Sequence, residues 1–276
     1  MWRIEQMVAW IVLASIFGGA LLLFFIYLLI LVRPRGKTPT DTRLLCDYAH
    51  RGLHGEEGMP ENSLAAFERA CALGFGIELD VQLSRDGEVM VFHDYTLLRM
   101  TGEEKKLCEL TAAELGALRL AQSDEKIPTL REVLALVDGR VPLLVELKGE
   151  SGDTSLCPRV AQLLSEYRGP YCVESFNPLL LRAMRRELPD SFLGLLYTNV
   201  YREKKKTILH GLLSIMAFNF LAKPNFIAYN ENYRRAFCVR LTTKFYRSPR
   251  FVWTVRSKEN LDLAHRLAEY PIFEKI

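Results

Sequence analysis

The sequence predicts an α/β domain, either a closed barrel or an open sheet, behind one N-terminal transmembrane helix. From about residue 44 onward, apolar runs of strand length alternate with segments of helical periodicity, as in α/β folds. The chain has 276 residues, 49% hydrophobic and 25% charged, which suffice for one large globular domain and a short appendage. The appendage is indicated by the stretch from Met7 to Val32, which contains no charged residue.

As a helix, the stretch from Met7 to Val32 would be about 39 Å long, enough to cross a hydrocarbon core of roughly 30 Å with some tilt. A buried core helix of this length would need an unusually large apolar surround. A cleavable signal sequence has a shorter apolar stretch that ends in small residues, whereas this one ends in large residues (24–29). We therefore predict a single-pass anchor with a basic flank over residues 1–37 and a globular domain over residues 38–276.

The charges beside the anchor predict its orientation. Arg33, Arg35 and Lys37 outnumber Arg3 on the other side, and positive flanks favour the cytoplasm. The globular domain is accordingly expected on the cytoplasmic face. Six cysteines without paired short spacings agree with reduced thiols. The net charge of +3 is too small, and the basic residues too scattered, for a nucleic-acid partner.

Nine apolar runs are candidate strands, one more than a (β/α)₈ barrel requires. They are Leu44–Ala49, Gly76–Val81, Val89–Phe92, Leu143–Leu147, Tyr171–Ser175, Phe192–Leu196, Phe226–Tyr229, Phe251–Val255 and Pro271–Phe273. The candidate helices are Ser63–Leu73, Ala112–Leu118, Leu130–Val137, Leu156–Tyr167, Pro178–Glu187 and Lys258–Glu269. Asn62 and Thr129 are expected to cap the helices that follow them.

One segment does not fit a plain barrel. Residues 202–224 begin with a basic cluster and continue with a run from Ile208 to Phe218 that is apolar on nearly all sides. The run is too short to span a membrane. It is expected either to lie in the bilayer interface, with its lysines among the headgroups, or to be a buried helix of the barrel's outer layer.

Ionisable residues stand at the ends of apolar strands, which in an α/β barrel face the catalytic mouth. His50 and Arg51 end the first strand, Glu78 and Asp80 lie in the second, and two further strands end in charged pairs (His93-Asp94 and Glu146-Leu147-Lys148). Side chains two residues apart on a strand share a face, so Glu78 and Asp80 point the same way. These strand ends therefore predict one polar cluster.

A hairpin brings the third strand back onto the second. Asp86-Gly87 between strand residues is typical of a two-residue turn, which pairs Arg85 with Glu88 and, further back, Asp80 with His93. So short a connection makes the pair antiparallel and accounts for the ninth strand.

Carboxylates gathered in this way form a hard oxygen site suited to Mg²⁺ or Ca²⁺ rather than zinc. Arg51 and Lys148 supply positive charge for a phosphate group. Histidines on either side can accept a proton from an attacking oxygen and donate one to a leaving alcohol. The combination indicates cleavage of a phosphodiester.

The motifs in which these residues stand resemble those of the glycerophosphodiester phosphodiesterase family over roughly residues 45–276. The matching motifs are Ala49-His50-Arg51-Gly52, Pro60-Glu61-Asn62-Ser63, Ile77-Glu78-Leu79-Asp80-Val81, Asp86-Gly87, Val91-Phe92-His93-Asp94, Val145-Glu146-Leu147-Lys148, Ser175-Phe176 and Trp253-Thr254-Val255. The resemblance implies a somewhat irregular TIM barrel. It also implies hydrolysis of a glycerophosphodiester, or of a lysophospholipid, to a glycerol phosphate and an alcohol in lipid metabolism.

The resemblance assigns a role to each candidate site residue. One divalent cation, Mg²⁺ or Ca²⁺, is bound by the residues matching Glu78, Asp80 and Glu146. The residues matching His50 and His93 form the acid/base pair, and those matching Arg51 and Lys148 contact phosphate. Glu61 is either a substrate contact or a structural hydrogen-bonding residue, and Trp253 lines the pocket. The chain departs from the family pattern in three places. Ser63 replaces a usual Thr and keeps its hydroxyl. Arg256 and the last strand depart further, and these two bear on substrate preference and barrel closure rather than on the metal site.

Three functional hypotheses remain open from the sequence. The substrate is either a soluble glycerophosphodiester or a membrane lipid, and the anchor favours the lipid. Internal attack to a cyclic phosphate would use His50 and His93 equally well. A catalytically silent barrel that binds lipid or acts as a scaffold is the alternative of another class, although the complete set of site residues argues against it.

Overall fold

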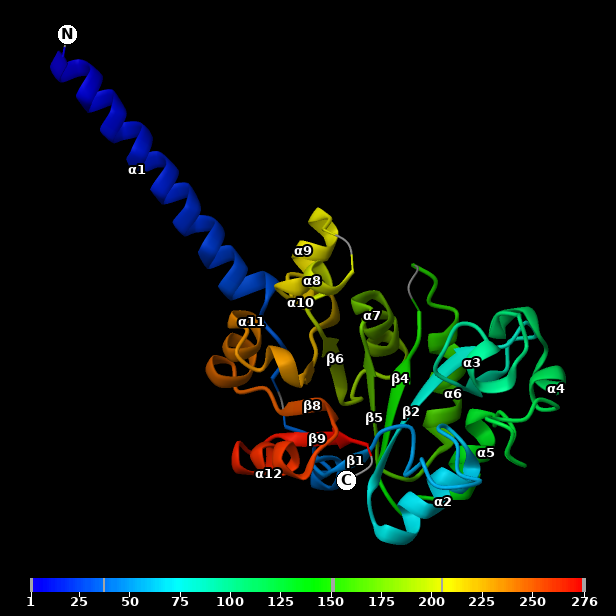
Figure 1. The fold of residues 1–276 in the computed structure, drawn as a ribbon. Helices are drawn as coiled ribbons and strands as arrows, with labels where there is room; N and C mark the ends of the chain where they lie inside the picture. The colour runs from blue at the N-terminus through cyan, green and yellow to red at the C-terminus, as the bar shows by residue number, and fades with distance from the viewer. Residues whose placement is uncertain (1, 37, 150–151, 205, 275–276) are drawn as a thin grey trace.

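The computed structural model describes residues 2–36, 38–149, 152–204 and 206–274 and shows a closed parallel barrel behind a long N-terminal helix (Figure 1). The barrel strands, in their order around it, are β1 (Tyr48–Ala49), β2 (Gly76–Leu83), β4 (Leu143–Leu147), β5 (Tyr171–Ser175), β6 (Leu193–Tyr197), β7 (Phe226–Asn230), β8 (Arg250–Val255) and β9 (Tyr270–Phe273). β1 pairs with both β2 and β9, which closes the ring. The predicted TIM-barrel class is confirmed.

The remaining strand, β3 (Val89–Val91), pairs antiparallel with β2 outside the ring, as the hairpin predicted. Its register differs from the prediction by one residue: Val81 is opposite Val91, and Phe92 donates its backbone N–H to Asp80. The expectation that His93 lies across from Asp80 is therefore wrong. The loop contains three residues, because Ser84 N–H bonds to the Glu88 carbonyl and Gly87 takes φ 82°. A left-handed glycine in that place produces a three-residue loop.

Helices and short helical turns connect the strands. They are η2 (Thr42–Leu44), α2 (Leu64–Leu73), α3 (Leu98–Thr101), η3 (Leu107–Glu109), α4 (Ala112–Leu115), α5 (Leu130–Val137), α6 (Leu156–Glu166), α7 (Pro178–Glu187), α8 (Val200–Glu203), α9 (Ile208–Ser214), α10 (Asn219–Ala222), η4 (Glu231–Tyr233), α11 (Phe237–Arg240), η5 (Leu241–Phe245) and α12 (Lys258–Arg266). Thr129 caps α5 as predicted. Asn62 does not cap α2: Ser63 does, by accepting from Ala66 N–H, and the Asn62 amide bonds to Asp80.

The inside of the barrel changes character along its axis. At the amino ends of the strands the inward side chains are apolar and form one cluster that includes Tyr48, Leu144, Phe226 and Phe251. Gly194 leaves the room that the Phe226 ring occupies, since a Cβ there would collide with the ring. Two residues further along several strands, the inward positions are ionisable. The apolar layer thus forms a floor, and the polar cluster lies above it.

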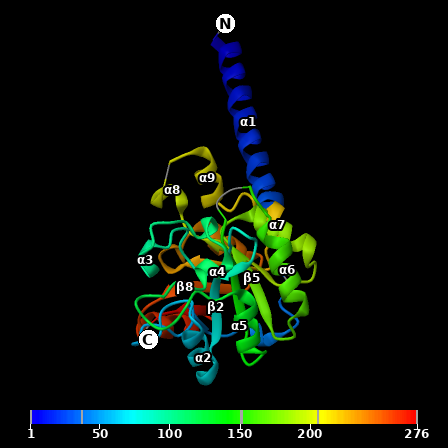
Figure 2. The same cartoon turned by 90° about the vertical axis from the view of Figure 1, so that its right-hand side faces the viewer.

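The N-terminal helix α1 (Trp2–Ile26) continues into a π-helical turn, η1 (Tyr27–Leu31). Residues 3–31 form one helix long and apolar enough to cross a membrane, and its apolar window is not buried in the protein. Val32 and Pro34, just beyond it, are buried against the barrel. In both views α1 leaves the barrel on the side where α8 and α9 project (Figures 1 and 2).

Candidate active site

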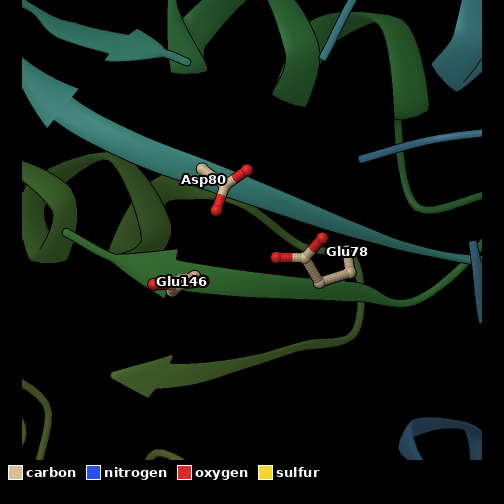
Figure 3. A group of neighbouring side chains, drawn as sticks. All are labelled: Glu78, Asp80 and Glu146. Atoms are coloured by element: carbon tan, nitrogen blue, oxygen red, sulfur yellow. The ribbon is translucent and has the colours of Figure 1, made fainter. Parts of the chain in front are cut away.

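Three buried carboxylates from neighbouring strands form the centre of the polar cluster. Glu78 and Asp80 come from β2 and Glu146 from β4, and in the parallel register Asp80 lies beside Glu146 (Figure 3). One oxygen of each lies within 4.8 Å of the others, and all three residues are buried. Each stands at an inward position above the apolar floor, which explains why charged residues interrupt apolar strands.

The electrostatics of this triad reflect carboxylates held close together away from water. Burial, followed by the charges of Asp80 and Glu146, raises the pKa of Glu78 well above its usual range. Burial also raises the pKa of Glu146 to about 7, although Lys148 opposes it. Burial would raise the pKa of Asp80 too, but Lys148, His93 and Arg51 outweigh it and hold that pKa below its ordinary value.

Lys148 supplies the nearest positive charge. Its Nζ lies 2.8 Å from Asp80 Oδ1 and 2.7 Å from Glu146 Oε1, and its side chain is 9% exposed. Burial lowers the pKa of Lys148, but Asp80 and Glu146 together raise it above the usual value. The ammonium group is therefore charged and offsets part of the negative charge of the triad.

Arg51 lies at the mouth of the barrel and contacts the triad through both backbone and side chain. Its backbone N–H donates to Glu78 Oε2 at 2.9 Å, and its Nε lies 3.5 Å from Asp80 Oδ2. Its φ is 56°, in the left-handed region that residues other than glycine rarely adopt. Such strain is often found at functional sites. A second side-chain bond, 2.9 Å from Nη1 to Glu61 Oε1, holds the guanidinium in place.

His50 is bound from behind by a carboxylate that the sequence did not point to. Its Nδ1 lies 2.5 Å from Glu274 Oε1, so Nε2 faces the triad, 3.8 Å from Glu78 Oε2. Glu274 Oε2 in turn accepts from Arg256 Nε at 2.8 Å. Burial would raise the pKa of Glu274, but His50 and Arg256 lower it to about 2. Arg256, a departure from the family pattern, thus steadies the partner of His50.

His93 is held in the same way. Its Nδ1 lies 2.6 Å from Asp94 Oδ1, and Arg99 Nε bonds to the other oxygen of that carboxylate at 2.5 Å. Burial lowers the pKa of His93, although Asp80 opposes this. Arg99 also reaches Glu61 Oε1 at 2.6 Å. The structure therefore contains two imidazole–carboxylate–arginine chains. In each of them the carboxylate bonds to Nδ1 of the histidine and not to Nε2.

These groups line a pocket of about 230 Å³. His50, Arg51, Glu78, His93, Glu146 and Lys148 border it. Glu61 does not border it and contacts the arginines instead. Trp253 and Phe176 also border the pocket and meet edge to face, with ring centroids 5.5 Å apart. Of the predicted site residues, all but Asp80 and Glu61 thus contribute to the pocket surface, and Asp80 lies buried beneath it.

A fourth carboxylate, Glu174 on β5, borders the same pocket and is only 1% exposed. It lies beside Glu146 in the strand register, and burial, followed by the charge of Glu146, raises its pKa well above the usual range. Sequence reasoning missed it, although Glu174 interrupts an apolar strand just as Glu146 does. That shared pattern was the signal that could have found it.

The donor set fits a divalent cation. Its oxygens are hard ligands that lie within 4.8 Å of one another. Burial raises the pKa of two of these carboxylates, and a bound cation would stabilise their ionised form. No Cys or His belongs to this group among the described residues, so a preference for zinc is not indicated.

Known proteins of one family resemble this chain. The model of the glycerophosphoryl diester phosphodiesterase family matches residues 50–273. A glycerophosphodiester phosphodiesterase of Caldanaerobacter subterraneus is 37% identical over 162 residues, which are 54% of this chain and 65% of that protein. Human glycerophosphodiester phosphodiesterase 1 is 33% identical over 149 residues, 50% of this chain and 44% of that protein. The chain thus spans from under half to about two thirds of the length of these relatives.

Solved structures show the same fold. An Oleispira antarctica phosphodiesterase, determined in complex with the product sn-glycerol-3-phosphate, superposes with a TM-score of 0.67 at 21% identity. The superposition covers 83% of this chain and 92% of that one. At this identity the likeness establishes the barrel and no more.

Proposed function

Because the chain belongs to the glycerophosphoryl diester phosphodiesterase family, we propose that it hydrolyses glycerophosphodiesters to a glycerol phosphate and an alcohol. One observation carries the proposal. Two histidines, each with Nδ1 bound by a carboxylate, border one pocket with a buried carboxylate triad. The glycerol phosphate in the Oleispira antarctica complex supports the choice of product.

We assign the cation to Glu78, Asp80 and Glu146 and expect one Mg²⁺ or Ca²⁺. When bound, the ion would polarise a phosphoryl oxygen and neutralise negative charge as it develops. Lys148 already pairs with two of these carboxylates, so its ammonium would share the same cluster with the ion. That position also directs it to phosphate oxygens bound there.

The chain's own residues carry the protons. Glu274 and Asp94 occupy Nδ1 of His50 and His93, so each imidazole presents Nε2 to the substrate. One Nε2 accepts a proton from the attacking water as its oxygen bonds to phosphorus. The other donates a proton to the alcohol oxygen as the phosphorus–oxygen bond to it breaks. Which histidine does which depends on the side from which the substrate enters.

Arg51 is the proposed phosphate clamp, because its guanidinium is held at the mouth by Glu61 and borders the pocket. The bonds of Glu61 to both Arg51 and Arg99 favour a structural role for it over substrate contact. Trp253 and Phe176 form an apolar wall suited to the organic group of the leaving alcohol.

We further propose that residues 1–37 anchor the domain of residues 38–276 in a membrane. The helix of residues 3–31 supports this, and the basic residues that follow favour a cytoplasmic placement of the barrel. An anchored enzyme meets membrane lipids readily, so a lysophospholipid in lipid metabolism is a candidate substrate beside soluble glycerophosphodiesters.

The test uses the full chain in detergent, incubated with glycerophosphocholine and with lysophosphatidylcholine after EDTA treatment and again with Mg²⁺ or Ca²⁺ added back. Release of glycerol phosphate or lysophosphatidate that EDTA abolishes and one cation restores is the expected result. Full activity in EDTA would refute the cation. Binding without turnover of either substrate would favour the silent, lipid-binding barrel.

Two further measurements test the route of cleavage and the membrane topology. Phosphorus NMR during turnover distinguishes direct hydrolysis from internal attack, because only the latter accumulates a cyclic phosphate. Protease treatment of sealed vesicles tests topology. Digestion of the barrel from the outer side of right-side-out vesicles would contradict the cytoplasmic placement.

A further inference from the structure

An exposed apolar surface surrounds the base of α1. It comprises residues 206–223 and 237–247, which include α9, α10, α11 and η5 and which we call the collar. Its exposed apolar residues are Ile208, Leu209, Leu212, Ile215, Phe220, Phe237 and Phe245. Ile208 is 86% and Phe245 is 71% exposed, fractions unusual for large apolar side chains on a protein that meets only water.

The apolar residues of the first segment follow helical spacing. Leu209 and Leu212 follow Ile208 by one and four positions within α9, which places the three on one face, and Ile215 comes directly after the helix. The opposite side faces the protein: Ser214 is buried, and its carbonyl accepts from the Tyr197 hydroxyl at 3.0 Å. The outer face has no comparable cover among the described residues.

The collar is fastened to the foot of α1. The Tyr27 hydroxyl donates to the Ile215 carbonyl at 2.9 Å, and the Asn219 amide donates to the Val32 carbonyl at 2.7 Å. The Tyr246 hydroxyl reaches the Leu28 carbonyl. Both collar segments thus bond to the last turns of the same helix, so the helix and the collar hold a fixed relation.

The length of α1 places the collar at the bilayer surface. Every residue from Met7 to Phe25 is exposed and uncharged, and 19 residues at 1.5 Å each make about 28 Å, close to the roughly 30 Å of a hydrocarbon core. Tyr27, two residues further along the helix, bonds to Ile215 of the collar. In both views α9 projects toward the side from which α1 departs (Figures 1 and 2). Ile215 therefore lies level with the end of the membrane-spanning stretch.

The charge of the collar matches anionic lipid. No Asp or Glu occurs between Lys204 and Asn230, nor between Asn232 and Lys258. Exposed basic side chains accompany the apolar ones: Lys206, Lys223, Arg240, Lys244 and Arg247. Apolar residues that enter the interface beside cations that meet phosphate headgroups are typical of interfacial helices.

We infer that the collar is a second membrane-binding surface, embedded in the anionic headgroup layer of the bilayer that α1 crosses. The inference rests on the proposed anchor and extends it. With the collar embedded, the barrel does not swing on a linker but keeps one orientation to the membrane. Of the two alternatives the sequence left for residues 202–224, this favours the interface.

The experiment places the photo-crosslinker p-benzoylphenylalanine at single positions of the full chain in nanodiscs of phosphatidylcholine and phosphatidylglycerol. The test positions are Ile208 and Phe245. Ile16, within the span, reports the anchor. Leu73 is the matched negative control, since it is 58% exposed and ends α2, which lies on the far side of the barrel from α1 (Figures 1 and 2). All four side chains are exposed, so the label should not disturb folding.

Lipid adducts at 16, 208 and 245, several-fold above position 73, are the expected result. Adducts at 16 but not at 208 or 245 overturn the collar and leave the anchor intact. No adduct at 16 overturns the anchor and the inference with it. Adducts from 208 to a second copy of the chain would mean that the surface is a protein interface. Hydrolysis is scored separately, so its failure leaves the adduct pattern to decide the inference.

A second experiment tests whether anionic lipid attracts the basic residues of the collar. Removing phosphatidylglycerol, or combining Lys206→Gln, Lys223→Gln and Lys244→Gln, should lower the adduct yield at 208 several-fold while the yield at 16 stays constant. A yield at 208 indifferent to both changes would overturn the role of anionic lipid.

Discussion

Replacing Glu274 by Gln removes the negative charge behind His50 and keeps the size of the side chain. The bond from His50 Nδ1 to Glu274 Oε1 is 2.5 Å long, and it is charge-assisted because its acceptor is a carboxylate. Glu274 does not border the pocket itself; it holds two residues that do, His50 and Arg256. The variant therefore tests the positioning of His50 without removing a group that borders the pocket.

The expected size of the effect follows from that bond. A hydrogen bond to a charged group contributes about 1.5–3 kcal/mol, and an imidazole that gains a proton during the reaction needs it most at the transition state. Since 1.36 kcal/mol is tenfold in rate, kcat should fall roughly 10- to 100-fold. KM should change little, because no group that touches the substrate is removed.

The assay is initial-rate release of glycerol 3-phosphate from glycerophosphocholine, with circular dichroism to verify folding. Glu68→Gln is the matched control: Glu68 is likewise bound by an arginine, Arg140, at 2.6 Å, but it lies outside the pocket on α2. This control should keep its kcat. An unchanged kcat in Glu274→Gln, or a rise in KM alone, would refute the positioning role.

Three further predictions follow. Asp80→Asn should abolish high-affinity cation binding in titration calorimetry and lower kcat by orders of magnitude, since it removes a buried ligand charge; unaltered binding would refute the assignment. His50 and Arg256 lower the pKa of Glu274 in the folded protein from its ordinary value of 4.5 to about 2. The ionised Glu274 therefore stabilises the fold fully above pH 4.5, and this stabilisation is lost as the pH falls through the folded pKa. The difference in Tm between wild type and Glu274→Gln should thus vanish at the acid end, and a constant difference would contradict it. Phe226→Ala, in the apolar floor of the barrel, should lower the free energy of unfolding by about 3–5 kcal/mol, whereas Leu73→Ala, at an exposed position, should change it little. Equal losses of the two variants in urea unfolding would contradict the packing role of the floor.

Local patterns predicted the elements well. The ranges of β4, β5, α5 and α7 agree with expectation to the residue, because apolar periodicity and neighbouring caps mark their ends. The hairpin was predicted in kind but not in register. Its loop length depends on whether Gly87 adopts a left-handed conformation, and a turn of two or three residues can carry the same Asp-Gly pair.

The partners of the histidines illustrate the remaining gap. Asp94 is adjacent to His93 in the chain, but Glu274 is 224 positions from His50 and meets it only because the barrel closes β9 onto β1. For Glu61 the sequence left a substrate contact and a structural hydrogen bond equally open, and its two arginine partners are visible only in the structure.

The sequence by itself determined the kinds of chemical groups at each strand end, the alternation that builds a barrel, and a helix long enough to cross a membrane. These depend on residue type and spacing within one element. Only the tertiary structure decided which groups touch: that Glu274 steadies His50, that Glu174 joins the pocket, and that the collar is fastened to the foot of α1. Such contacts arise from ring closure and packing between distant segments, for which no single stretch of the chain carries the information.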